Sequence, residues 1–276
     1  MTKTQYQFSP LVAQSDVHIH STFSDGKNTI QEMVNAASKL QLKTVAISDH
    51  APIPIECPCN MKEDQFSSYI KTIDDLIIPH PRIKILKALE LDYLEGKTPL
   101  SKDIIEQLDL TIGSVHFLKF KNEFKAIDES PACFKELLNY FGDISKFAHA
   151  YTQALAECVQ IYNPTILGHI DLFIKFNEQH LFFDESAINW EEIYAPLFSS
   201  LPKSTAIEIN TGAISRGYKT KPYPNVHLLK VIKKFKDIKL IINSDAHSTN
   251  GIKSHFEEAA SIISELNMSN QLYSIL

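Results

Sequence analysis

The chain has 276 residues, of which 44% are hydrophobic and 22% charged, a composition typical of an ordered globular protein and not of a disordered or fibrous one. Its formal net charge of −6 argues against a nucleic-acid partner, because proteins that bind polyanions carry clustered positive charge. The sequence contains no apolar run long enough to span a membrane and no signal-peptide core at its N-terminus, so we expect a cytoplasmic protein that acts on a small molecule.

Short apolar runs of strand length alternate with segments of helical periodicity along the chain. The expected strands cover residues 17–19, 44–47, 83–91, 108–115, 165–167, 206–209 and 238–242. The expected helices cover residues 29–40, one or two segments within 133–162, 225–236 and 254–266, and residues 51–74 read as a loop followed by a helix. This alternation predicts βαβ units with a parallel sheet. Seven units without a dividing linker favour a closed barrel, with residues 1–276 in a single domain, over an open sheet.

The four cysteines are too few for a disulfide framework in a chain of this length. Cys57 and Cys59 are separated by one proline and lack a second pair at zinc-site spacing. We therefore expect all four to be thiols, with Cys133 and Cys158 as the other two.

Side chains that bind metals recur where the expected strands end. They are His18, His20, His50, Glu90, His116, His169, Asp245 and His247. The C-terminal ends of barrel strands converge on one face, so residues far apart in sequence would meet there. Imidazole and carboxylate together suit zinc, manganese or iron, and this set exceeds the needs of one ion. The pattern predicts a site for two or three ions with Glu90 as a bridge.

A single histidine at a strand end is more often a hydrogen-bonded structural residue than a ligand, so the prediction rests on the whole set. The remaining histidines scatter over helices and loops, where we expect surface or structural roles: His80, His149, His180, His227 and His255. Two aspartates leave alternatives open. Asp25 is either a turn residue or a ligand, and Asp49 is a candidate for orienting a ligand.

The segments that carry these residues resemble the motifs of the polymerase and histidinol phosphatase (PHP) family of metal-dependent phosphoesterases, and within it the stand-alone histidinol-phosphatases. In chain order they read DVHIHSTFSDG, AISDHAP, ALELDYLEG, IGSVHFL, LGHIDL, IEINTGAISRG and NSDAH. Each motif is short, but their order and spacing extend over nearly the whole chain. The resemblance implies a distorted (β/α)7 TIM-like barrel that holds three divalent ions of zinc, manganese or iron.

The resemblance further implies hydrolysis of a phosphate monoester, most specifically L-histidinol phosphate in histidine biosynthesis. It carries ligand roles onto the eight residues above and adds Asp25 as a ninth. Arg216, one of only two arginines, is a candidate to bind the substrate phosphate with two parallel hydrogen bonds. Related phosphatases have an arginine after the GHIDL motif where this chain has Lys175, which would bind phosphate as a point charge.

These assignments predict direct attack on phosphorus by a hydroxide that two ions share, with Glu90 bridging them. A third ion, held by some of Asp25, His50 and His247, would bind a phosphate oxygen, and His247 is a candidate proton donor to the leaving group. Three alternatives remain: a phosphatase for a sugar or nucleotide phosphate, a metal-dependent amidohydrolase, and a metal-binding domain without turnover.

Overall fold

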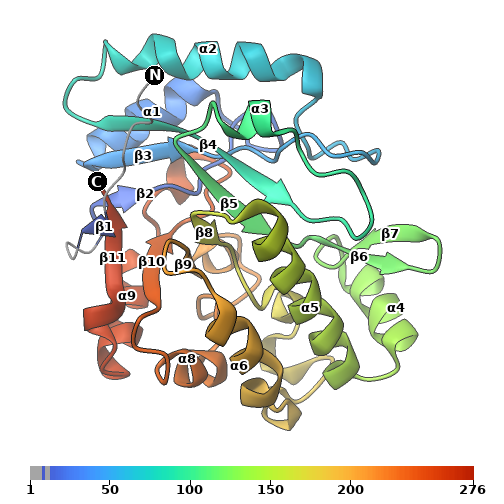
Figure 1. Ribbon diagram of the computed structural model, residues 1–276. Helices are drawn as coiled ribbons and strands as arrows, with labels where there is room; N and C mark the ends of the chain where they lie inside the picture. The colour runs from blue at the N-terminus through green and yellow to red at the C-terminus, as the bar shows by residue number, and fades with distance from the viewer. Residues whose placement is uncertain (1–7, 10–12) are drawn as a thin grey trace.

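The structure, a computed structural model, describes residues 8–9 and 13–276. One sheet runs through its centre (Figure 1) and consists of β1 (Phe8–Ser9), β2 (Ser15–Asp16), β3 (Thr44–Ile47), β4 (Lys84–Asp92), β5 (Leu110–Ser114), β8 (Ile166–Leu167), β9 (Ala206–Asn210), β10 (Lys239–Asn243) and β11 (Leu272–Ile275). The strand order is β1-β11-β10-β9-β8-β5-β4-β3-β2. Every neighbouring pair is parallel except β1 and β11.

The barrel closes between β2 and β10. Ile19, just after β2, pairs with Ala246, just after β10. His20 N–H donates to Ala246 O at 2.9 Å, and Ala246 N–H donates to His18 O at 3.2 Å. The seven strands from β2 to β10 therefore form a distorted barrel that is joined at their C-terminal ends. The expected (β/α)7 TIM-like fold is confirmed.

The first strand differs from the expectation. The parallel ladder covers Ser15 and Asp16, whereas residues 17–19 contribute only the single bridge at Ile19. Val17 N–H donates instead to the Asn243 side chain at 3.1 Å, so a side chain replaces the missing backbone partner. The structure also contains elements that were not expected from the sequence: β1, β11 and a hairpin of β6 (Phe117–Phe120) and β7 (Glu123–Ala126).

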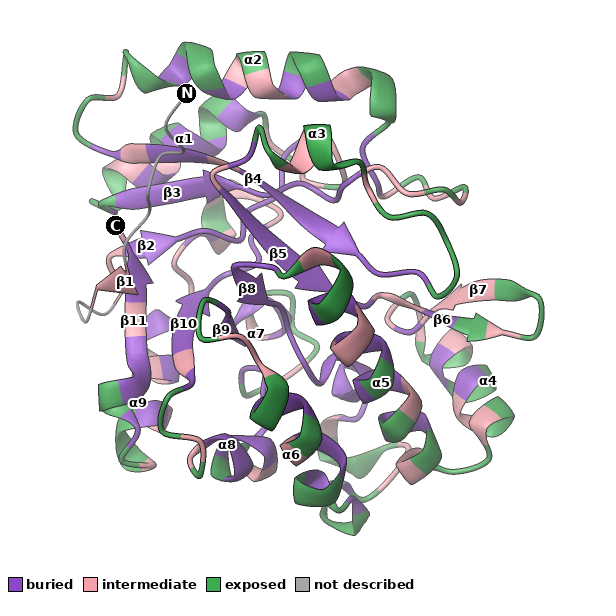
Figure 2. Cartoon of the chain, in the orientation of Figure 1, coloured by how far each residue is buried: buried purple, intermediate pink, exposed green. Residues whose placement is uncertain are grey.

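Helices lie around the barrel, and most of them bury one face (Figures 1 and 2). They are α1 (Ile30–Lys39), α2 (Phe66–Ile77), α3 (Lys102–Ile105), α4 (Pro131–Phe141), α5 (Ile144–Tyr162), α6 (Trp190–Ser200), α7 (Gly212–Ser215), α8 (Val226–Ile232) and α9 (Phe256–Glu265). Short 3-10 turns are η1 (Glu63–Gln65), η2 (Leu172–Ile174), η3 (Glu178–His180), η4 (Glu185–Ala187), η5 (Thr249–Gly251) and η6 (Ser269–Gln271). Thr29 and Glu32 form a capping box at the start of α1. Among the described residues, no helix combines the length and apolar character needed to cross a membrane.

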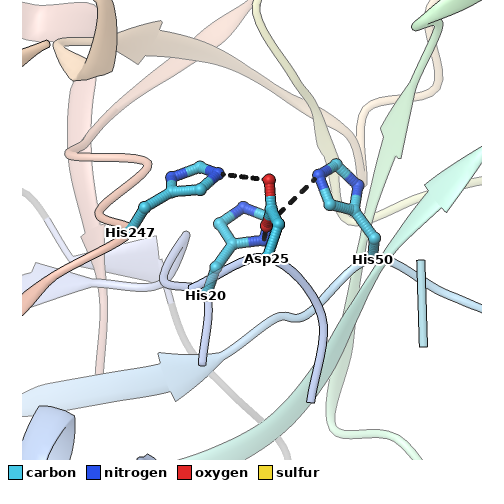
Figure 3. A group of neighbouring side chains, drawn as sticks. All are labelled: His20, Asp25, His50 and His247. Carbon is cyan, nitrogen blue, oxygen red and sulfur yellow. Dashed lines mark ion pairs between the residues drawn. The ribbon is translucent and has the colours of Figure 1, made fainter. Parts of the chain in front are cut away.

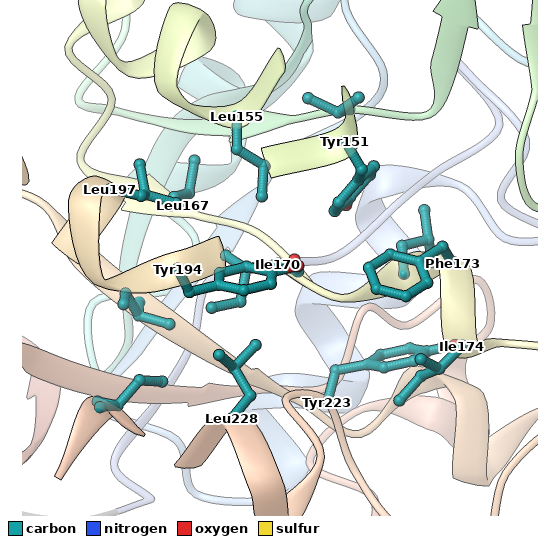
Figure 4. Packing of buried hydrophobic residues seen from close by; sticks show 14 of the residues in the cluster. Tyr151, Leu155, Leu167, Ile170, Phe173, Ile174, Tyr194, Leu197, Tyr223 and Leu228 are labelled. Atoms are coloured by element: carbon teal, nitrogen blue, oxygen red, sulfur yellow. Dashed lines mark hydrogen bonds between the residues drawn. The ribbon is translucent and has the colours of Figure 1, made fainter. Parts of the chain in front are cut away.

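An aromatic-rich layer packs α5, α6 and α8 against the outside of the barrel (Figure 4). Phe173 stacks on Trp190 with a centroid distance of 6.0 Å and meets the Tyr151 ring edge-on at 5.3 Å. The Tyr151 and Tyr194 hydroxyls donate to the carbonyls of His169 and Ile170, at 3.2 and 2.8 Å. This layer therefore holds the segment that follows β8 in place through both packing and hydrogen bonds.

The barrel interior is apolar at the N-terminal ends of the strands. A separate buried cluster there draws residues from around the barrel: Val17, Ala46, Leu86, Ala88, Leu110, Ile112, Ile166, Ala206, Ile241 and Ile275. Along β4 the side chains at every second position, Leu86, Ala88 and Glu90, point to the same side of the strand. The inward positions of β4 are thus apolar towards its N-terminal end, whereas the next of them holds the carboxylate of Glu90.

The expectation that all four cysteines are thiols is wrong for one pair. Cys57 and Cys59 form a disulfide, with their Cα atoms 5.4 Å apart. The chain turns at Pro58 and brings two cysteines that are separated by one residue within bridging distance. Cys133 and Cys158 are free, as expected.

Candidate metal centre

The barrel brings the predicted ligand residues together at one end. His18 and His20 follow β2, His50 follows β3, and Glu90 lies within β4. The others follow the next strands: His116 after β5, His169 after β8, and Asp245 and His247 after β10. All eight meet because parallel strands present their C-terminal ends on the same face of the barrel.

Glu90 lies at the centre of this group and is 1% exposed. Five histidine nitrogens approach its two carboxylate oxygens within 3.6 Å: His18 Nε2 at 3.2 Å, His20 Nε2 at 3.5 Å, His50 Nδ1 at 3.2 Å, His116 Nε2 at 3.6 Å and His169 Nε2 at 2.9 Å. Ser114 Oγ donates to Glu90 Oε1 at 2.6 Å. A carboxylate that faces histidines on both oxygens has the position of a bridge between ions.

Seven of the nine predicted ligands, all except His169 and Asp245, fall into three overlapping groups whose ligand atoms lie within 4.8 Å of one another. These are His20, Asp25, His50 and His247 (Figure 3); His18, His20 and Glu90; and His50, Glu90 and His116. Mixed imidazole and carboxylate groups of this kind suit divalent transition metals. The site can therefore bind divalent metal ions.

Asp25 reaches the first of these groups through the loop after His20. His247 Nε2 lies 3.1 Å from Asp25 Oδ2, and His20 Nδ1 lies 3.6 Å from Asp25 Oδ1. Gly26 folds back on His20 so closely that a Cβ atom would lie 2.6 Å from the His20 carbonyl carbon. Asp25 therefore lies in a tight turn and also faces the first ligand group, so the turn interpretation and the ligand interpretation do not exclude each other.

Asp49 stabilises the same loop. Its carboxylate is buried and accepts hydrogen bonds from the Ser21 N–H and hydroxyl, both at 2.7 Å, and from the Ser24 hydroxyl at 2.5 Å. The sequence analysis considered Asp49 for orienting a ligand. The structure places it beneath the loop that carries Asp25, so it acts on the position of the loop.

Several imidazole nitrogens are suited to ligation because they are buried without a hydrogen-bond partner among the described residues. They are His18 Nε2, both nitrogens of His20, His50 Nδ1 and His169 Nδ1. Leaving a buried polar atom unpaired costs about 1–3 kcal/mol, and a cation bound there would remove this cost. Burial and the neighbouring His247 lower the pKa of His20 to about 3, so its imidazole is in the neutral form that binds metals.

The pKa values of Glu90 and of the histidines around it depend on one another. Burial alone would raise the pKa of Glu90, but His18 and His116 hold it well below the usual value. Burial would lower the pKa of His50, but Glu90 and Asp92 outweigh it and raise the value to about 10. Without cations the site thus balances ionised carboxylates with protonated histidines, and metal binding must displace these protons.

Two buried carboxylates that the sequence analysis missed orient the ligands. Glu208 Oε1 lies 2.7 Å from His18 Nδ1, and Asp92 Oδ1 lies 2.5 Å from His116 Nδ1. Asp92 shares the inward face of β4 with Glu90, two positions away, so strand alternation was the signal that could have found it. Such partners fix the ring orientation of a metal-binding histidine.

The two candidate phosphate-binding residues lie at the edge of the site. Arg216 Nη2 donates to Asp245 Oδ2 at 2.9 Å, and Nη1 lies 2.9 Å from His247 Nδ1. Lys175 Nζ donates to the carbonyl and the carboxylate of Asp128 at 2.8 and 2.9 Å. Arg216 therefore contacts predicted ligands directly, whereas Lys175 is already engaged by an acid.

Both residues line a cavity of about 650 Å³ that opens onto the ligand groups. Its walls include Phe117 and Phe124 of the β6–β7 hairpin, Tyr218, and the loop that carries the disulfide. A cavity of this size accommodates a small molecule.

Comparison with known proteins agrees with the geometry. The profile of the PHP domain family matches residues 16–212. The chain is 26% identical over 261 residues to the histidinol-phosphatase of Bacillus subtilis, with 88% of this chain and 96% of that protein covered.

Two solved structures share the fold. That of hisK from Listeria monocytogenes has a TM-score of 0.78 and 22% identity, with 88% of this chain and 99% of that one covered. That of the histidinol phosphate phosphatase from Lactococcus lactis, complexed with zinc, L-histidinol and phosphate, has a TM-score of 0.67 and 19% identity. In that case 96% of this chain and 100% of the other are covered.

Proposed function

The chain belongs to the PHP domain family, and on this premise we propose that it is a metal-dependent phosphoric monoester hydrolase that acts on L-histidinol phosphate. The observation that carries the proposal is the convergence of five histidine nitrogens on the two oxygens of Glu90 beside a substrate-sized cavity. The substrate follows from the relatives that span nearly the same length, including the Lactococcus lactis structure with L-histidinol and phosphate.

We assign the site three divalent ions of zinc, manganese or iron. The proposed ligands are His18, His20, Asp25, His50, Glu90, His116, His169, Asp245 and His247. The three overlapping ligand groups support the number, and the zinc in the Lactococcus lactis protein makes zinc the first metal to test. Bound ions would neutralise phosphate charge and lower the pKa of a water at the site.

The chain's own residues would place the phosphate. Arg216 lies at the edge of the cavity with its guanidinium beside Asp245 and His247, so its remaining N–H groups can donate to phosphate oxygens. Lys175 Nζ lies 4.8 Å from the Tyr218 ring centroid and is bound by Asp128, so we assign it a supporting charge in the wall.

His247 is also the candidate that protonates the leaving oxygen, in a state in which its ring does not bind an ion. Its side chain is 18% exposed, more than the other five histidines of the site. Its Nε2 faces Asp25, and its Nδ1 lies 2.9 Å from the Asp245 carbonyl. Asp25 and this carbonyl would hold the ring at the cavity edge, where a leaving alkoxide departs.

The experiment that tests the function is a comparison of kcat/KM for L-histidinol phosphate with a panel of sugar and nucleotide phosphates and a cyclic amide. The protein is assayed as purified, after chelation, and after zinc, manganese or iron is restored. We expect the highest kcat/KM for L-histidinol phosphate and loss of activity on chelation. Preference for another phosphate ester would replace the substrate, and full activity without metal would overturn the mechanism.

A further inference from the structure

Glu208 lies on β9, and its carboxylate contacts the side chain of the predicted ligand His18, whose ring it orients. Its side chain is 0% exposed. We propose that Glu208 is a positioning residue that keeps the proton of His18 on Nδ1 and so leaves Nε2 free to bind metal. The inference rests on the proposed ligand role of His18.

Four groups surround the two oxygens of Glu208. Oε1 lies 2.7 Å from His18 Nδ1 and accepts from Asn243 Nδ2 at 2.9 Å. Oε2 accepts from the His169 backbone N–H at 3.0 Å and from Asn210 Nδ2 at 2.9 Å. Three of these partners are donors, and the fourth is an imidazole nitrogen that can either donate or accept.

The orientation of both asparagine amides is determined by other contacts. Asn243 Oδ1 accepts from the Val17 backbone N–H at 3.1 Å, so its NH₂ group must face Glu208. Asn210 Oδ1 accepts from the Gly212 N–H at 2.9 Å, so its NH₂ group faces Glu208 as well. Neither amide can rotate to accept a proton from Glu208 without leaving a backbone N–H unpaired.

The proton of His18 follows from this arrangement. Three donors favour the ionised form of Glu208, which can only accept, so Glu208 supplies an acceptor to His18 Nδ1. With its proton on Nδ1, neutral His18 presents an unprotonated Nε2, which lies 3.2 Å from Glu90 Oε2 and 3.8 Å from Asp245 Oδ1. This is the nitrogen that faces the predicted metal group.

Glutamine has the same shape but cannot replace this carboxylate. The His169 backbone N–H cannot become an acceptor, so the glutamine oxygen would stay on that side and its NH₂ group would face His18 and Asn243. His18 would then accept on Nδ1 and carry its proton on Nε2. The exchange of one oxygen for an NH₂ group therefore removes the ligand nitrogen, and it also turns a donor towards the Asn243 NH₂ group, which lowers stability.

The first measurement uses the unaltered protein loaded with zinc. Long-range ¹H–¹⁵N NMR correlations identify which ring nitrogen of His18 carries the proton. We expect the proton on Nδ1, hydrogen-bonded and slow to exchange. A proton on Nε2 with zinc on Nδ1 would overturn the inference whatever any variant does.

The second measurement is a competitive zinc titration of Glu208→Gln, with Glu185→Gln as the matched control. Glu185 is also buried, and it accepts from two asparagine amides, Asn177 and Asn225, each at 3.1 Å. Both variants lose a buried carboxylate that is surrounded by donors. We expect about 10–100-fold weaker binding of one zinc ion in Glu208→Gln only.

Equal zinc affinity in the two variants would overturn the proposal, even if both unfold at a lower temperature, because a purely structural role predicts that result. Neither measurement uses a substrate. A protein that binds zinc as expected but hydrolyses no phosphate ester would contradict the proposed function and leave the role of Glu208 intact.

Discussion

The two ends of the barrel interior use the same strands for different purposes. At the N-terminal ends the inward side chains are apolar, as with Leu86 and Ala88 of β4 and Ile112 of β5. Two residues further along, the inward positions hold Glu90 on β4 and Ser114 on β5. The backbone geometry is common to both ends, so the type of side chain alone makes one end a packed core and the other a reactive site.

Buried polar residues support the predicted ligands at the polar end. They include Ser48, which pairs with the Ile19 backbone, together with Ser114, Glu208 and Asn243. Each of these side chains is hydrogen-bonded, which satisfies the polar groups that burial removes from water. The comparison leads to a general expectation: substitutions at the apolar end lower stability, and those at the polar end lower metal binding and activity.

The largest effect is expected for Glu90→Gln at the polar end. It removes the charge that five histidines face, so we expect kcat/KM to fall on the order of 10³-fold, equivalent to several kcal/mol of lost charge stabilisation. Steady-state kinetics, metal analysis and circular dichroism check this together. Normal metal content with unchanged kcat/KM would contradict the central place of Glu90.

At the apolar end, Ile112→Ala is expected to lower the free energy of unfolding by about 2–5 kcal/mol, because it leaves a cavity where the side chain was 0% exposed. Denaturant unfolding measures the loss. The control is Ile78→Ala, whose side chain is 87% exposed and whose effect should stay within about 0.5 kcal/mol. If Ile112→Ala lost metal while keeping its stability, the two ends would not be separable.

A smaller effect is expected for Arg216→Ala, which tests the edge of the polar end. The loss of charge-assisted hydrogen bonds to phosphate should raise KM about 10-fold, the equivalent of about 1.4 kcal/mol. Arg82→Ala is the matched control, since Arg82 is the other arginine and is exposed. Equal KM values for the two variants would remove Arg216 from the phosphate site.

The smallest effect concerns the Asp128–Lys175 pair in the cavity wall. Burial alone would raise the pKa of Asp128, but Lys175 and His116 hold it below its ordinary value of 3.8. A carboxyl whose pKa is lowered on folding stabilises the protein above its unfolded pKa, and this contribution disappears as the pH falls through the lowered value.

Asp128→Asn should therefore cost about 1 kcal/mol of unfolding free energy at pH 7 and progressively less as the pH falls below 4. Unfolding curves at both pH values check it. Asp75→Asn breaks an exposed pair with Lys71 and should cost at most about 0.5 kcal/mol at either pH. A loss of unfolding free energy in Asp128→Asn that increases toward low pH would contradict the predicted pH dependence.

The elements that depend on local pattern were predictable. The strand at residues 44–47 follows from an apolar run, and the histidines at strand ends follow from the position of each one within its own motif. The resemblance of these motifs to a known family then implied a ligand role for Asp25, whose turn position alone left two interpretations open.

The sequence by itself determined the alternation of strands and helices, and the ligand type at each strand end, because these depend on neighbouring residues. Only the tertiary structure decided the closure through Ile19 and Ala246, and the contact of Glu208 with His18, 190 positions away. It also showed that Lys175 is held by Asp128. Such contacts depend on which strands become neighbours when the barrel closes, and no local periodicity carries that information.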